Sequence, residues 1–310
     1  MDKRLKIYIA GHRGMVGSAI SRRLTAGGYA NVITRTHAEL DLTNQAAVGQ
    51  FLASEKPDFI FLAAAKVGGI HANNIYRAEF IYQNLMMEAN IVHAAWQAGV
   101  KRLIFLGSSC IYPRDCHQPI REEYLLTGPL EQTNEPYAIA KIAGIKLCES
   151  YNHQYGAQYL SVMPTNLYGP NDSYDLNTSH VLPALIRKAH EAKIRGDKKL
   201  VVWGTGQPMR EFLYVDDLAD ACIFLMEKDI RQGLFNIGTG VDITIQDLAK
   251  TVMSVVGFEG EIVFDASKPD GTPRKLLNVD RMHALGWKAR TPFRDGIAKA
   301  YADFLNKFGN

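Results

Sequence analysis

Short apolar segments alternate with amphipathic segments through the first half of the chain. Two of the apolar segments, 60–64 and 103–106, are continuously apolar, as expected for strands that are covered on both faces. The amphipathic segments carry apolar residues at helical spacing. This alternation predicts an α/β protein with a doubly wound parallel sheet. The expected strands are 6–10, 31–34, 59–63, 102–107 and 159–163, and the expected helices are 16–26, 45–54, 78–98 and 136–155.

The pattern changes after about residue 165. Turns rich in Gly, Pro, Asn and Asp then separate shorter elements, and there is no internal repeat or Gly/Ser-rich linker. We therefore expect residues 1–165 to form a cofactor domain, with later segments at about 212–240 returning to it. Residues 166–310 are expected to form mainly a smaller α/β substrate-binding domain.

Composition and charge narrow the functional classes. The net charge of +3 comes from scattered Lys and Arg residues, which gives no reason to expect nucleic acid or a membrane surface as partner. No apolar run approaches the roughly 20 residues of a membrane-spanning helix, and the N-terminal apolar stretch is too short for a secretory signal. Cys110, Cys116, Cys148 and Cys222 lack metal-site spacing. We expect a cytoplasmic protein with free thiols and no metal.

A glycine-rich turn follows the first predicted strand. Glycines at 11, 14 and 17 have the spacing G-x-x-G-x-x-G between a strand and a helix, where backbone can approach a pyrophosphate at a helix N-terminus. A glycine pattern alone is weak, and the alternative is a turn without a ligand. Its place at the first strand–helix turn favours a Rossmann-type dinucleotide site. The predicted contacts are Gly11, His12, Arg13, Gly14, Met15, Val16 and Gly17.

The end of the second predicted strand bears on the choice of cofactor. Folds that prefer NAD usually carry an acidic residue there for the ribose 2′-hydroxyl, whereas this chain has Arg35. A guanidinium can pair with a 2′-phosphate, and Arg13 could add a second charge. This favours NADPH/NADP; the alternative is that Arg35 is a solvated surface residue.

Candidate catalytic residues lie in the fourth helix and at the end of the fourth strand. Tyr137 and Lys141 are four residues apart and so share one helix face. A nearby ammonium stabilises a phenolate, so we expect Lys141 to lower the pKa of Tyr137. Ser108 follows the strand 102–107, at the sheet edge where such folds bind ligands. Tyr137 would pass a proton to a carbonyl oxygen while Ser108 donates a hydrogen bond to it.

Together these motifs resemble the extended short-chain dehydrogenase/reductases, particularly those that act on GDP-keto sugars. The matching stretches are Ala10–Gly17, Ala63–Gly69, Leu106–Pro113, Asn134–Tyr151, Met163–Pro170, Pro208–Asp217 and Asp265–Lys275, and they span nearly the whole chain. The resemblance implies further cofactor contacts at Leu106, Gly107, Ser108, Ser109, Lys141, Pro164, Thr165, Asn166, Leu167 and His180.

A thiol and an imidazole suggest chemistry beyond ketone reduction. Cys110 follows Ser108 by two residues, and His180 precedes the expected helix 181–193. A 4-keto group acidifies the hydrogens on C3 and C5 of a sugar, so inversion there needs a base and an acid. The resemblance assigns these roles to Cys110 and His180. The alternatives are a small buried hydrophobe for Cys110 and a solvated residue at a helix start for His180.

The resemblance also implies a substrate and an assembly. The substrate would be a GDP-4-keto-6-deoxy sugar, contacted by Lys188, Trp203, Arg210 and Asp270, and the reaction would be NADPH-dependent 3,5-epimerisation and 4-keto reduction. The alternatives are a 4-reductase of a related GDP-keto sugar or heptose without epimerase activity, and a non-catalytic NADP sensor. Helices 78–98 and 136–155 have more apolar surface than one packed face needs, so we expect them to form a homodimer.

Overall fold

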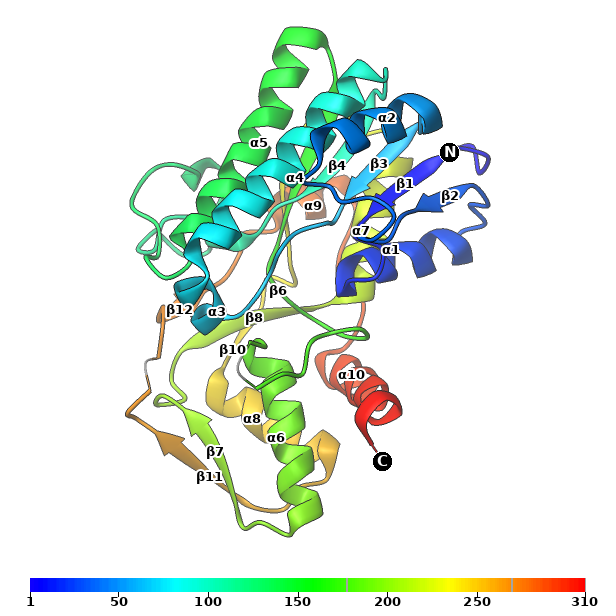
Figure 1. The fold of residues 1–310 in the computed structure, drawn as a ribbon. Coiled ribbons are helices and arrows are strands. Elements are labelled where there is room, and N and C mark those ends of the chain that lie inside the picture. The colour runs from blue at the N-terminus through cyan, green and yellow to red at the C-terminus, as the bar shows by residue number, and fades with distance from the viewer. Residues whose placement is uncertain (177, 269, 310) are drawn as a thin grey trace.

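The computed structural model describes residues 1–176, 178–268 and 270–309. Its largest sheet has six parallel strands (Figure 1). In spatial order they are β2 (Val32–Thr34), β1 (Ile7–Ala10), β3 (Phe59–Leu62), β4 (Arg102–Leu106), β5 (Gln158–Pro164) and β9 (Gly233–Ile237). β2 lies on one side of β1, whereas β3 and the strands after it lie on the other side. The topological switch point is therefore between β1 and β3, which is where such sheets bind ligands.

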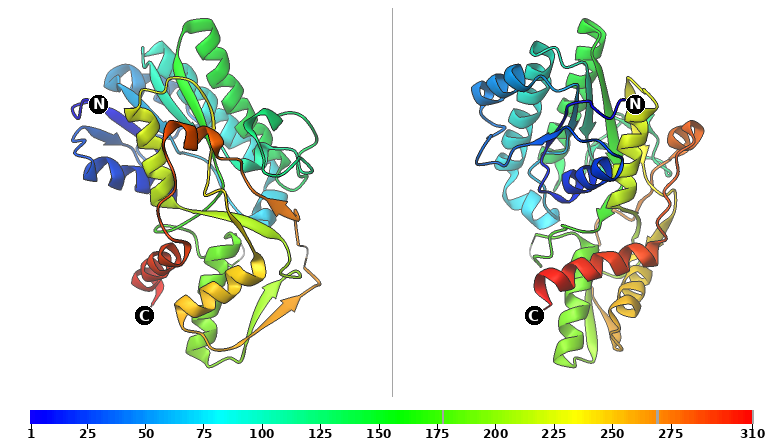
Figure 2. Two further views of the ribbon diagram at one scale, coloured as in Figure 1. Left: turned by 180° about the vertical axis from the view of Figure 1, so that it is seen from behind. Right: turned by 90° about the vertical axis from the view of Figure 1, so that its right-hand side faces the viewer.

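Helices cover both faces of this sheet. One face carries α1 (Met15–Ala26), α7 (Val215–Glu227) and α9 (Asp280–Leu285), of which α7 and α9 are on the near side in Figure 2, left. The other carries α2 (Gln45–Glu55), α4 (Arg77–Gln97) and α5 (Glu135–Tyr155), and the short α3 (Ile70–Ile75) precedes α4. The predicted α/β doubly wound sheet is thus confirmed, and the strand and helix bounds agree with the predicted ones to within one or two residues.

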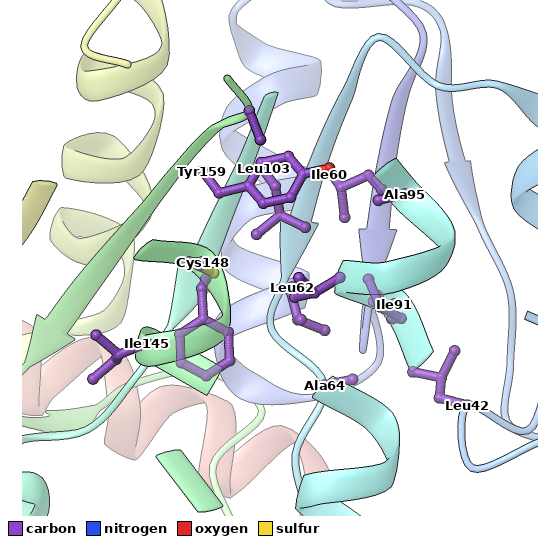
Figure 3. Close-up of a cluster of buried hydrophobic side chains, with 14 of the residues drawn as sticks. Leu42, Ile60, Leu62, Ala64, Ile91, Ala95, Leu103, Ile145, Cys148 and Tyr159 are labelled. Atoms are coloured by element: carbon purple, nitrogen blue, oxygen red, sulfur yellow. The ribbon is translucent and has the colours of Figure 1, made fainter. Parts of the chain in front are cut away.

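Two apolar cores lie on the two faces of the large sheet. Figure 3 shows part of the first, in which Ile60 and Leu103 of the strands pack against Ile91 of α4 and Ile145 of α5. The second lies under α1 and α7. Cys148 is buried in the first core and Cys222 in the second, and all four cysteines are free. Both positions suit small apolar side chains.

A smaller group of elements lies below the large sheet in Figure 1. The strands β10 (Asp242–Thr244), β8 (Met209–Tyr214), β12 (Arg274–Lys275) and β6 (Asn166–Tyr168) form one sheet, and β11 (Glu261–Asp265) pairs with β7 (Lys199–Trp203). They pack with α6 (Val181–Arg195), α8 (Ile245–Val256) and α10 (Phe293–Phe308) around a third apolar core. No helix among the described residues is long and apolar enough to cross a membrane.

Local signals explain where several helices begin. The side chain of Asn44 accepts a hydrogen bond from Ala47 N at 3.1 Å and caps α2. Thr244 caps α8 by accepting from Asp247 N at 3.0 Å. At α1 and α6, in contrast, Gly14 and His180 occupy the N-cap without a side-chain cap. Two helices that begin at predicted site residues therefore leave first-turn N–H groups without a side-chain partner.

Candidate active site

The glycine turn packs directly against the sheet. Gly11 has φ of 87°, and a Cβ there would lie 2.8 Å from Ala64 Cα, just after β3. A Cβ on Gly17 would lie 2.2 Å from Gly11 O. Only glycine fits at these two positions, and the close packing brings the start of α1 to the point between β1 and β3 where the chain direction switches.

The same turn fits a phosphate group. A Cβ on Gly14 would make only an ordinary contact of 3.5 Å with Gly11 O, so the protein itself leaves space there. Nδ1 of His12 is buried and has no hydrogen-bond partner among the described residues. Met15 and Val16 open α1 and pack on the second core. Free N–H groups, a positive helix end and an unpaired imidazole nitrogen suit an anion such as a dinucleotide pyrophosphate.

Two arginines converge at the end of β2. Arg35 Nη1 donates to Thr34 O at 2.8 Å, and Nη2 pairs with Glu55 of α2 at 2.8 Å. Hydrogen bonds from Thr36 lower the pKa of Glu39, and the charges of Arg35 and Arg13 lower it further. Both guanidinium groups therefore lie near one point of this loop. Arg35 is held in place by protein partners and is only partly exposed, which differs from a free surface arginine.

The carboxyl ends of β4 and β5 present the next group of predicted residues. Leu106 ends β4, Gly107 and Ser109 are buried, and the Ser108 hydroxyl accepts from Cys110 N at 3.4 Å as η1 (Ser109–Ile111) begins. Pro164 ends β5, and Leu167 packs on the second core. Thr165 and Asn166 both donate to Glu211 O of β8. Residues 166–168 form the short strand β6, which pairs with β8.

Tyr137 and Lys141 lie on one face of α5, as their spacing predicts. Lys141 Nζ is 5.8 Å from the centroid of the Tyr137 ring, and Tyr137 also meets Phe80 edge-on. The prediction that Tyr137 has a lowered pKa is wrong. Burial raises the pKa of Tyr137 well above 10, and nearby Cys110 and Glu88 raise it further, whereas a hydrogen bond with Ser108 lowers it.

One cause of the raised Tyr137 pKa is Glu88, which forms an ion pair that the sequence did not predict. Lys141 Nζ lies 2.9 Å from Glu88 Oε1 of α4, and both side chains are almost fully buried. Burial raises the pKa of Glu88, and the charge of Lys141 opposes that rise. The Lys141 ammonium thus pairs with the Glu88 carboxylate and also lies near the Tyr137 ring.

Cys110 and His180 are both influenced by the charge of a third residue, Lys275 of β12. Burial raises the pKa of the Cys110 thiol, and the charges of Lys275 and Lys141 lower it. Burial and the charge of Lys275 both lower the pKa of His180. Cys110 and Lys275 also line the same pocket beside Ser109 and Tyr112. The thiol, the imidazole and the ammonium are therefore close enough to influence one another's proton affinity.

The position of His180 is set by the segment that precedes α6. Gly69, beyond β3, donates from its backbone N to Thr178 O at 2.8 Å, and a Cβ on Gly69 would lie 2.8 Å from Ser179 O. The segment before α6 is thus packed against the loop that follows β3. At the N-cap of α6 the His180 residue keeps solvent-exposed surface, while the groups packed around its imidazole desolvate the ring.

The four predicted substrate residues form two neighbouring pairs in the smaller group of elements. Lys188 Nζ is 5.0 Å from the centroid of the Trp203 ring, which is exposed at the end of β7. Asp270 accepts from Thr205 N and Thr205 Oγ1, and its charge acts on Arg210 of β8. Burial lowers the pKa of both Lys188 and Arg210. Half-buried cations beside an exposed aromatic face suit a phosphorylated ligand with a flat ring.

Comparisons with known proteins place the chain in a family. Residues 7–238 match the model of the NAD dependent epimerase/dehydratase family. The chain belongs to that family. It is 58% identical over 309 residues to "GDP-L-fucose synthase" from Escherichia coli K12, covering 97% of this chain and 96% of the relative.

Two solved structures have the same fold over nearly their full length. A GDP-6-OMe-4-keto-L-xylo-heptose reductase from Campylobacter jejuni is 39% identical, with a TM-score of 0.94 and 99% of each chain covered. A GDP-L-fucose synthetase from Naegleria fowleri bound to NADP is 29% identical, with a TM-score of 0.92, covering 100% of this chain and 95% of that one.

Sequence reasoning missed two residues of this epimerase/dehydratase site. Lys275 closes the matching stretch Asp265–Lys275, so its neighbours could have drawn attention to it. Glu88 gave no such signal, because a carboxylate in an amphipathic helix ordinarily reads as a solvated charge. Its contact with Lys141 depends on α4 and α5 lying side by side, as they do in Figure 1.

Proposed function

We propose that the chain is a GDP-L-fucose synthase. It converts GDP-4-dehydro-6-deoxy-D-mannose to GDP-L-fucose by 3,5-epimerisation and NADPH-dependent reduction of the 4-keto group. The observation that carries this proposal is the presence of two proton-transfer sets at one sheet edge. Ser108, Tyr137 and Lys141 form the first, and Cys110 and His180, both under the influence of one ammonium group, form the second.

The cofactor proposal rests on the turn after β1 and the loop after β2. NADPH, when bound, supplies the hydride that reduces the 4-keto carbon. The turn from Gly11 to Gly17 would hold the pyrophosphate at the start of α1, and Arg13 and Arg35 would pair with the 2′-phosphate. The Naegleria fowleri relative is described as bound to NADP, which supports this choice. Residues 106–109, Lys141, 164–167 and His180 would line the remaining length of the dinucleotide.

Reduction requires a proton at the carbonyl oxygen. Tyr137 would donate it, and Ser108 would hold the same oxygen with a hydrogen bond. The raised pKa of Tyr137 suits this direction, because a proton donor must carry its proton at the working pH. Lys141 would hold the nicotinamide ribose hydroxyls.

Epimerisation requires a base and an acid on opposite faces of the sugar. Cys110 would remove the C3 and C5 protons in turn, and His180 would return protons to the other face. Burial raises the pKa of Cys110 above its usual value, so the base needs a nearby positive charge. Lys275 would provide it, because its ammonium favours the thiolate.

The smaller group of elements would bind the sugar nucleotide. Lys188 and Arg210 would neutralise the diphosphate, Trp203 would offer its flat face, and Asp270 would accept hydrogen bonds from the substrate. We also propose that residues 1–165 with the returning segment near 212–240 hold the cofactor, and that 166–310 mainly hold the substrate. The enzyme would work in the cytoplasm as a homodimer through α4 and α5.

A heptose 4-reductase is the second candidate, because a Campylobacter jejuni heptose reductase has a TM-score of 0.94 with this chain. The lower identity of 39%, against 58% for the Escherichia coli relative, favours the fucose product. The test is to incubate the chain with GDP-4-keto-6-deoxymannose and NADPH, follow nicotinamide absorbance, and identify the sugar. Formation of GDP-L-fucose is expected. Oxidation of NADPH with a sugar unchanged at C3 and C5 would favour the second candidate, and no oxidation would reject both.

A further inference from the structure

The catalytic lysine has a buried carboxylate partner that none of the proposed steps uses. Glu88 and Lys141 come from different helices, and their side chains are 1% and 2% exposed. Neither carboxylate oxygen of Glu88 has a partner with hydrogen-bond geometry among the described residues, so the 2.9 Å contact with Lys141 is an ion pair alone. A buried charge without full compensation is costly, so a carboxylate at this place needs a reason beyond packing.

The surroundings make room for this carboxylate. A Cβ on Gly144 of α5 would lie 2.7 Å from Glu88 Oε2 and 2.4 Å from Phe105 Cζ, so only glycine fits beside it. Lys141 Nζ also lies 4.8 Å from the centroid of the Phe105 ring of β4. The ammonium is therefore confined between a carboxylate, an aromatic face and the ring of Tyr137.

We infer that Glu88 is a positioning residue for the reduction. It holds the Lys141 ammonium beside Tyr137 in a buried ion pair of 2.9 Å, so that a carboxylate and not a phenolate compensates this positive charge. This inference rests on the proposed role of Tyr137 as the proton donor and deepens it. An enzyme that only reduces its substrate needs the phenol, whereas a lone lysine beside the tyrosine would favour the phenolate.

The charges around Tyr137 agree with this inference. Among the described residues, the ionisable groups that raise the pKa of Tyr137 are Cys110 from η1 and Glu88 from α4, after burial. Lys141, on the same helix as Tyr137, is the charged group that faces Glu88. Replacing Glu88 by an uncharged residue of the same shape therefore removes the carboxylate that compensates Lys141, and the ammonium charge then acts on the phenol.

The test measures the titration of Tyr137 directly, without substrate or cofactor. Protein labelled with ¹³C at tyrosine Cζ is titrated by NMR, and the Tyr137 signal is assigned from its loss in Tyr137→Phe. In Glu88→Gln we expect the Tyr137 pKa to fall by about one unit or more. The matched control is Glu227→Gln, which removes an exposed carboxylate from α7, on the opposite face of the sheet, and should leave Tyr137 unchanged. A Tyr137 signal unchanged in Glu88→Gln up to the pH at which the wild type unfolds would overturn the inference.

A kinetic readout follows the same group during turnover. As the pH is raised, the rate of NADPH oxidation should begin to fall at a lower pH in Glu88→Gln than in the wild type. Solvent deuterium exchange at C3 and C5 should keep the pH profile of the wild type. A wild type that oxidises no NADPH would reject the proposed function, and the NMR titration would still decide the role of Glu88.

A second variant covers the case in which Glu88→Gln does not fold, since removing one partner of a buried ion pair is strongly destabilising. Glu88→Asp keeps the charge but withdraws it by about 1.5 Å, one bond length. We expect a smaller fall of the Tyr137 pKa in the same direction and a lower maximal rate of reduction. If Glu88→Asp left both the titration and the maximal rate unchanged, Glu88 would be only a packing residue.

Discussion

Arg35 is the residue on which we expect cofactor choice to depend most. Its guanidinium is fixed by Thr34 and Glu55 and lies near Arg13 at the end of β2. We predict that Arg35→Ala lowers the preference for NADPH over NADH about 10- to 100-fold, because a hydrogen bond to a charged group is worth about 1.5–3 kcal/mol. The ratio of kcat/KM for the two cofactors measures this change.

The control for this prediction is another arginine with an acidic partner. Arg231 is exposed and pairs with Asp229 at 2.8 Å, so Arg231→Ala should leave the cofactor ratio unchanged. If the wild type used NADPH and NADH equally, Arg35 would have no role in binding a 2′-phosphate.

Asp172, in the turn after β6, should make stability depend on pH. Burial raises the pKa of Asp172 from 3.8 to about 7, and its Oδ2 has no partner among the described residues. The folded state therefore binds an extra proton between about pH 4 and pH 7, and this carboxyl lowers stability as pH rises through that window. We predict that Asp172→Asn raises the free energy of unfolding by about 1–2 kcal/mol at pH 8 and brings no gain at pH 4.

Urea denaturation at the two pH values checks this prediction. Asp197, an exposed carboxylate paired with Arg195 at 2.7 Å, is the matched control, and Asp197→Asn should have a small effect that is similar at both pH values. A stability loss in Asp172→Asn at pH 8 would show that the carboxylate is charged and stabilising in the folded state.

Individual site residues were predictable to different degrees. Motif spacing located the glycine turn, Ser108, Tyr137 and Lys141, because each is tied to one strand end or one helix face. The Glu88–Lys141 pair and the place of Lys275 depend on contacts between distant elements. Local periodicity contains no information on which side chains of two helices will meet, so these residues and the raised pKa of Tyr137 required the structure.

At the scale of elements, the glycine turn between β1 and α1 leaves no space for an added side chain at Gly17. We predict that Gly17→Ala abolishes cofactor binding and destabilises the fold by about 1–3 kcal/mol, since the new Cβ would meet Gly11 O at 2.2 Å. Gly49→Ala in α2 is the matched control, because nothing lies within 4 Å of its Cβ position. It should leave binding intact and raise stability by about 0.5–1 kcal/mol. Calorimetric titration with NADPH and thermal unfolding measure both, and equal effects of the two substitutions would contradict the steric account.

The positions of most elements followed from the sequence, but their pairing did not. Buried strands such as β3 and β4 appear as continuous apolar runs, and α1, α2, α4 and α5 carry helical periodicity, so their bounds were close to the observed ones. The short strand β6 was not among the predicted elements, because its three residues pair with β8, far along the chain. The position of β9 beside β5 is likewise set by long-range contacts.

For the whole molecule, the outer surface of α4 and α5 leads to a prediction about assembly. Tyr82 of α4 is 62% exposed, and Ile139 of α5 is also exposed. We predict a homodimer through these helices, with Tyr82→Glu shifting it to monomer at micromolar concentration because a charge would then face an apolar interface. Ile194 of α6 is 71% exposed, and Ile194→Glu is the control that should stay dimeric. Sedimentation velocity reads out both, and a wild-type monomer would contradict the prediction.

The central claim is that one site performs two separable chemistries on one sugar. Deuterium incorporation at C3 and C5 of GDP-4-keto-6-deoxymannose, read by NMR in D₂O without NADPH, isolates epimerisation from reduction. Cys110→Ser replaces the thiol by a hydroxyl, a far weaker acid, and should abolish this exchange, whereas Tyr137→Phe should retain exchange and lose NADPH oxidation. Exchange at the wild-type rate in Cys110→Ser would contradict the account, because the cysteine would then be a packing residue and the assignment of the epimerase chemistry to Cys110 would have no basis.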